Sequence, residues 1–286
     1  MKYYQYIFLN IFFLSIFSSC GNEKTIKKNN TEKNSVKIYG SDSVFPLLKK
    51  EKDDFKVVNK SISISLNGGG SQIGINKLIE GKADIAMSSR KISKSEKEKF
   101  KKKNLTIKST VIAYDAIMVI VHPDNPVNKI TRENLEKIYT GKIKNWKELG
   151  GSNLKIIPYS REKTSGTYEY FKEKVLNGNN YSSNLKSTHV TSAIVESVER
   201  KLGGIGYISL AFRSIFIKPL AISFDNGKNY IHPNLVNTKN KTYPISRPLY
   251  LLYNKSINEE KSKLIQFTLS SKGQEIVSEI GYIKVN

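Results

Sequence analysis

Three times along this chain, a short apolar strand leads into a polar turn that contains a serine, and the turn leads into a helix with one apolar face. The turns lie at residues 40–46, 68–71 and 161–167. Strands that alternate with helices in this way are typical of α/β folds with largely parallel sheets. The pattern therefore predicts an α/β protein in which three helices each begin beside a serine.

The turn at residues 161–167 has the features of an anion site. The first backbone N–H groups of a helix have no partner inside it and lie at the positive end of its dipole. Gly166 allows close approach of a ligand, Ser165 and Thr167 add hydroxyl donors, and Arg161 adds a planar set of charged donors. An ordinary capped helix with an exposed arginine would explain the same residues, so this turn alone decides nothing.

The first twenty residues differ in kind from the rest. A basic start at Lys2 precedes an apolar run at residues 7–17, which is too short to span a membrane. We interpret residues 1–19 as a lipoprotein signal peptide that ends before Cys20, the only cysteine and the predicted lipid attachment site. The site resembles a lipobox except for Phe17, and a plain signal peptide with a stray cysteine is the alternative. Residues 20–35 are polar and predict a flexible tether.

Charge and composition restrict the partners. The chain has 286 residues and a formal net charge of +22, which favours anionic partners. Because acidic residues interrupt the lysine-rich stretches, we favour a solvated basic surface over a nucleic-acid footprint. The three histidines lie far apart, so we expect no metal, and no cofactor motif is present. Without a nucleophile elbow or a Walker loop, we also expect no enzyme.

Several short motifs in a fixed order resemble the PstS family, the phosphate-binding lipoproteins of ABC-type phosphate importers. The resemblance runs from about Val36 to the C-terminus. Its motifs are GSDSVFP at 40–46, GGGS at 68–71, ADIAMSSR at 83–90, IYTGKIKNW at 138–146, the 161–167 turn, GIGY at 204–207 and YPISRP at 243–248. Each motif is weak alone, but the set in this order is specific.

The resemblance implies two α/β lobes with mixed, largely parallel sheets, joined by a two-strand hinge with a ligand cleft between them. We expect lobe 1 to comprise residues 36–115 and 250–286, and lobe 2 residues 116–249. The family's phosphate-binding positions fall on Ser43, Val44, Phe45, Ser71, Asp84, Arg161, Ser165, Gly166 and Thr167. In the first turn, we expect a side-chain contact from Ser43 and a backbone contact from Val44 or Phe45.

Asp84 has a special role in this hypothesis. A buried carboxylate only accepts hydrogen bonds, so it favours hydrogen phosphate, which carries a proton, over sulfate, which carries none at neutral pH. Ser88 and Ser89 either line the site or only end their strand, and the sequence does not separate these two readings.

The function implied is an extracytoplasmic, lipid-anchored, monomeric receptor that captures inorganic phosphate and delivers it to the permease and ATPase subunits of an ABC importer. We expect no nucleic-acid partner. Three alternatives remain. They are a receptor for sulfate or molybdate, a phosphoester hydrolase that uses one of the serines, and a surface lipoprotein that binds polyanions through its lysines.

Overall fold

The computed structural model describes residues 35–285 of the chain. These residues lie in one compact unit, Asn34–Asn286. The predicted signal peptide, Cys20 and all but the last residue of the predicted tether lie outside the described range. Among the described helices, none combines the length and the apolar character needed to cross a membrane.

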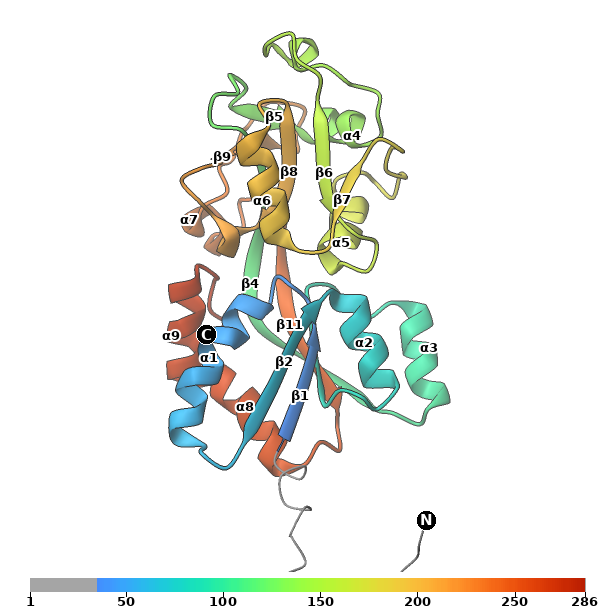
Figure 1. The fold of residues 1–286 in the computed structure, drawn as a ribbon, viewed down its shortest axis with the longest axis vertical. Helices are drawn as coiled ribbons and strands as arrows, with labels where there is room; N and C mark the ends of the chain where they lie inside the picture. Colours follow the sequence, from blue (N-terminus) through green and yellow to red (C-terminus); the bar gives the residue numbers. More distant parts are fainter. Residues whose placement is uncertain (1–34, 286) are drawn as a thin grey trace, which may run out of the picture. The chain divides into compact units, whose positions relative to one another are not determined.

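Lobe 1 is a parallel sheet with helices packed against it (Figure 1). Strand β1 pairs in parallel with β2 on one side and β3 on the other. Alternating burial along β1 places Val36 and Ile38 in the core, where they meet Leu47 and Phe55 of the first helix. The elements are β1 Ser35–Gly40, α1 Phe45–Val58, β2 Ser63–Gly69, α2 Ser71–Ile79, β3 Ile85–Ser88, α3 Lys94–Lys102, α8 Glu259–Leu269 and α9 Ser271–Ile280.

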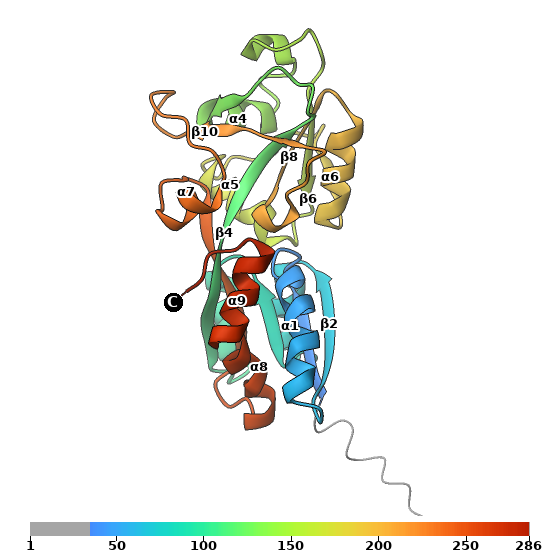
Figure 2. The same cartoon turned by 90° about the vertical axis from the view of Figure 1, so that its left-hand side faces the viewer.

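Two antiparallel strands, β4 Ile107–Val121 and β11 Ser246–Asn254, connect the lobes (Figure 1), and Figure 2 shows β4 running from one lobe into the other. Strand β11 lies between β3 and β4, and β4 continues past it to pair with β8 of lobe 2. The apolar run at residues 111–121 forms most of β4, which begins four residues before it, at Ile107. The two strands are the hinge that the family resemblance implied.

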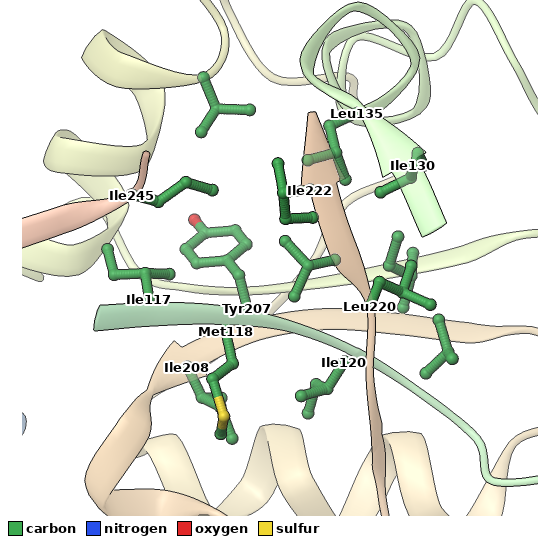
Figure 3. Close-up of a cluster of buried hydrophobic side chains, with 14 of the residues drawn as sticks. Ile117, Met118, Ile120, Ile130, Leu135, Tyr207, Ile208, Leu220, Ile222 and Ile245 are labelled. Carbon is green, nitrogen blue, oxygen red and sulfur yellow. The ribbon is translucent and has the colours of Figure 1, made fainter. Parts of the chain in front are cut away.

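Lobe 2 repeats the arrangement around β6, which pairs in parallel with β7 and β8. Its core contains Met118, Ile120 and Tyr207, which point into the cluster of Figure 3. Trp146 is buried, and its ring nitrogen donates to Gly203 O at 3.1 Å. The elements are β5 Lys129–Thr131, α4 Arg132–Tyr139, η1 Trp146–Leu149, β6 Ile157–Arg161, α5 Gly166–Lys174, β7 Lys186–Thr188, α6 Thr191–Arg200, β8 Gly204–Ser209, η2 Leu210–Phe212, β9 Lys218–Pro219, β10 Ala221–Ser223 and α7 Leu235–Lys239.

The fold class is as predicted: two α/β lobes with mixed sheets, in which the hinge strands β4 and β11 pair antiparallel with each other and with β8 and β3. One hydrophobic cluster of buried side chains draws on positions 116–245, and a second on positions 36–113 and 249–282. These memberships fit the proposed lobe boundaries at 115/116 and 249/250, which stay a prediction.

A buried glutamate sits in the core of lobe 1. Glu51 on α1 is fully buried; its Oε2 accepts from Thr268 Oγ1 at 2.6 Å, while its Oε1 has no partner. Burial raises the pKa of Glu51 to about 8, and the Thr268 hydrogen bond opposes that rise. The side chain is therefore protonated in the folded protein at neutral pH.

This glutamate predicts a pH dependence of stability. Between about pH 4.5 and pH 8, the unfolded chain carries an ionised Glu51 and the folded chain a protonated one. The free energy of unfolding should then fall by about 1.4 kcal/mol per pH unit through this window because of this group. Replacing Glu51 with glutamine should remove that contribution in urea titrations at several pH values. The exposed Glu98→Gln variant should keep the slope, and equal slopes in all three proteins would contradict the prediction.

Candidate functional site

Turns from both lobes meet between them, and hydrogen bonds join the lobes there. Ser43 Oγ of lobe 1 lies 3.1 Å from Thr167 Oγ1 of lobe 2. The backbone N–H of Gln72, in the first turn of α2, donates to Thr164 O at 3.1 Å. Helices α2 and α5 accordingly lie on either side of this junction (Figure 1). Three segments that are far apart in sequence thus form one cluster, as the sequence analysis expected.

The helix starts supply backbone donors to this cluster. Helix α2 begins at Ser71 and α5 at Gly166, with Ser165 as the N-cap whose Oγ accepts from Thr167 N at 3.2 Å. The amides of Ser71 and Gly166 are buried and donate to no other residue of the described chain. A Cβ at position 166 would lie 2.7 Å from Ser89 Oγ and overlap Ser71 Oγ. Only glycine therefore permits this approach of the two lobes.

Arg161, at the end of β6, is 2% exposed and held by three acceptors. Its Nη1 donates to Asp42 Oδ2 at 2.9 Å and to Thr191 Oγ1 at 3.0 Å, and its Nη2 donates to His189 O at 2.5 Å. Its Nε is buried and has no partner. Burial lowers the pKa of Arg161 and Asp42 opposes that shift, but a guanidinium keeps its charge in proteins.

Asp42 is a site residue that was not predicted from the sequence. Its Oδ2 accepts from Arg161 and from the Thr191 backbone N–H, the latter at 2.9 Å, so it links lobe 1 to the start of α6. Its Oδ1 accepts no hydrogen bond from the described part of the chain. The available signal was its position beside Ser43 in the first turn.

Arg247 on β11 is the second site residue that was not predicted from the sequence. Its Nη2 donates to Ser43 Oγ at 2.9 Å and to Thr167 Oγ1 at 3.0 Å, and its Nη1 is buried without a partner. Asp115 of β4 lies 3.0 Å from the same Nη2, and neither side chain of the pair is more than 1% exposed. Burial raises the pKa of Asp115, whereas Arg247 and the Ser209 hydroxyl act against that rise.

The sequence left two alternatives open, one in the first turn and one at the end of β3, and the structure bears on both. The amides of Val44 and Phe45 both donate to Ser41 O, which favours the Ser43 hydroxyl as the first-turn group. Ser89 joins the cluster, since its N–H donates to Ser71 Oγ at 3.1 Å. Ser88 Oγ instead donates to Arg90 O at 2.8 Å, so Ser88 only ends the strand.

The prediction for Asp84 is wrong. Asp84 precedes β3, whereas the cluster lies after the other end of that strand, where Ser89 follows it. Its carboxylate accepts from Lys37 N at 2.8 Å and pairs with Lys261 Nζ at 2.7 Å, and its side chain is 22% exposed. Asp84 therefore fixes β1 and α8 at the far end of lobe 1, and the proton-acceptor hypothesis cannot rest on it.

A small pocket of about 250 Å³ opens beside the cluster and is lined from both lobes, by Ser89 and Arg90 on one side and Tyr170 and Glu173 on the other. Arg90 also forms an ion pair with Glu169 across this pocket. The cluster itself contains four charged side chains, and their formal charges sum to zero. They are Arg161, Arg247, Asp42 and Asp115. Within residues 35–285, no three metal-ligating side chains lie close enough together to hold an ion.

Comparisons with known proteins agree with this architecture. Residues 26–272 match the family model of the PBP superfamily domain. The phosphate-binding protein PstS of Staphylococcus aureus is 31% identical over 277 residues, which cover 94% of this chain and 84% of the relative. The chain belongs to the PstS family. A solved structure supports the same assignment. It is a putative phosphate ABC transporter substrate-binding protein from Clostridium perfringens with bound phosphate, 36% identical, with a TM-score of 0.81, and the match covers 88% of this chain and all of the Clostridium chain.

A further family structure, the ABC-type phosphate transport receptor of Vibrio cholerae, is 28% identical with a TM-score of 0.71, and the match covers 87% of this chain and 99% of that one. These family members span most of the described residues and both lobes. The resemblance inferred from short motifs is therefore confirmed, and so is the two-lobed fold that it implied.

Proposed function

We propose that this chain binds inorganic phosphate between its lobes and presents it to the permease of an ABC importer. The observation that carries the proposal is a set of unpaired donors at one place. Arg161 Nε and Arg247 Nη1 are buried without partners, and the amides of Ser71 and Gly166 are free at two helix starts. Buried donors without partners are costly, and a tetrahedral oxyanion would satisfy them.

The number of donors fits binding in the micromolar range. Hydrogen bonds to a charged group contribute roughly 1.5–3 kcal/mol each, so four of them contribute roughly 6–12 kcal/mol. The upper end of this range, less an association cost of roughly 4 kcal/mol, reaches the roughly −8 kcal/mol of a micromolar complex. Because the donors come from both lobes, bound phosphate favours the closed arrangement. The relatives are named as binding proteins and a transport receptor, and we propose the same non-enzymatic role here.

We also propose that the chain acts outside the cytoplasm as a monomer anchored by lipid on Cys20, which is the expectation from the sequence. Calorimetric titration of the chain without residues 1–19 and with Cys20→Ser should show one phosphate per chain. The affinity should change little with salt, because the site is enclosed and its charged side chains sum to zero. Sulfate binding as tight as phosphate binding, or turnover of a phosphoester, would overturn the proposal.

Asp42 is our candidate for the group that selects phosphate over sulfate. Its free Oδ1 can accept the proton that hydrogen phosphate carries, whereas sulfate would meet a repelling acceptor. We expect Asp42→Asn to reduce the phosphate-to-sulfate affinity ratio about tenfold or more, since an amide can donate to sulfate. Competition titrations with both anions measure the ratio. The Asp84→Asn variant is the matched control and should leave the ratio unchanged.

A further inference from the structure

A second cavity lies at the hinge, on the side where α7 and α9 flank β4 in Figure 2. Its volume is about 990 Å³, within the range of small-molecule sites. Hinge residues Tyr114 and Pro248 contribute to its wall, with Leu235 from lobe 2 and Ile283 and Val285 from lobe 1. We call this cavity the hinge groove. An occupant would touch both lobes and both hinge strands at once.

The wall of the hinge groove is apolar in part. Leu235 and Tyr114 are 41% and 39% exposed, although both are large hydrophobic side chains. Pro244 and Ile283 continue this surface. Exposed apolar side chains that gather in one concave place mark a binding surface more often than scattered ones do.

The charge of the hinge groove has one sign. Lys174, Lys239, Lys241 and Lys284 line it, together with Arg247, and none of its lining residues in the described chain is Asp or Glu. None of these four lysines forms an ion pair with any carboxylate of residues 35–285. Arg247 is 1% exposed and belongs to the phosphate cluster, so the four lysines supply the charge of the hinge groove. A lysine excess without counter-charges attracts anions.

We propose that the hinge groove is a second binding site, separate from the phosphate site, for an organic anion with an aromatic or acyl body. The apolar wall would hold the body and the lysines would hold the acidic group. Inorganic phosphate lacks the apolar part and fits the enclosed cluster instead. The proposal does not depend on the proposed function, because no residue of the hinge groove other than Arg247 belongs to that cluster.

Anilinonaphthalene sulfonate, which combines an aromatic body with one anionic group, is the probe. Fluorescence titration of the folded chain should show saturable binding. Reversing one lysine from each lobe, in the double variant Lys239→Glu/Lys284→Glu, should weaken it about tenfold or more. Leu235→Ser should also weaken it. The matched control Lys101→Glu/Lys102→Glu, which reverses two exposed lysines on α3, should not.

A calorimetric phosphate titration separates the two sites. The Lys239→Glu/Lys284→Glu variant should bind phosphate as the parent chain does while it binds the probe poorly. Three results would each overturn the proposal: no saturable probe binding, equal weakening in the α3 control, or one-for-one displacement of the probe by phosphate.

Discussion

Replacing Arg161 with alanine is expected to weaken phosphate binding by about 1,000-fold or more. The change removes the guanidinium charge together with its buried, unpaired Nε donor, and one charge-assisted hydrogen bond is worth roughly 1.5–3 kcal/mol. It also leaves Asp42 in the cluster without its cation, so a repelling carboxylate faces the ligand. Calorimetric titration with phosphate measures the effect, and an unchanged unfolding midpoint shows that the variant folds.

Two companion variants separate the causes of this loss. Arg161→Lys keeps the charge but not the planar set of donors, so we expect intermediate affinity. Adding Asp42→Ala to Arg161→Ala removes the unpaired carboxylate and should recover part of the affinity, a coupling that a double-mutant cycle measures. The exposed Arg200→Ala variant on α6 is the control. If Arg161→Ala binds within tenfold of the parent chain, Arg161 is only a structural residue.

Local sequence patterns predicted most of the fold. The start of α5 was located because its cap is local: Ser165 comes directly before the helix, and its Oγ accepts from Thr167 N. Helix α2 likewise begins at Ser71, in the predicted turn at residues 68–71. The short strands β5 and β7 and the five-residue helix α7 were missed. Elements of this length are stabilised by neighbours rather than by a pattern of their own.

The site was only partly predictable, since its charged pairs join distant segments. Arg161 and Asp42 are 119 residues apart, and Arg247 and Asp115 are 132 apart. Local patterns identified the serine turns and Arg161 but not their counter-charges. Asp84 was predicted to lie at the site, but it lies at the opposite end of β3. The sequence did not show which end of this strand faces the other lobe. One usable signal was overlooked, because Asp115 and Arg247 are opposite charges inside two apolar strands, which predicts a buried pair.

Replacing Asp115 with alanine is expected to lower the free energy of unfolding by about 3–5 kcal/mol, because it leaves the Arg247 guanidinium buried without its counter-charge. Asp115 also accepts from Ser209 Oγ at 2.8 Å and from Leu210 N at 3.2 Å, so two further donors lose their partner. Urea unfolding at neutral pH without phosphate measures the loss. Asp53→Ala, which removes an exposed carboxylate from α1, should change stability by less than about 0.5 kcal/mol.

Phosphate should stabilise the Asp115→Ala variant more than it stabilises the parent chain, and so offset part of this loss. With Asp115 absent, the charged side chains of the cluster sum to +1 rather than zero, and Arg247 Nη2 keeps its hydrogen bonds to Ser43 and Thr167 but loses its carboxylate partner. An anion at the site would serve as the missing counter-charge. Binding to the folded state stabilises it in proportion to the logarithm of ligand concentration over Kd. Because tighter binding lowers Kd, the unfolding midpoint of Asp115→Ala should therefore rise further at any given phosphate concentration than that of the parent chain. A smaller rise would mean that Arg247 does not face the bound anion and serves the hinge alone.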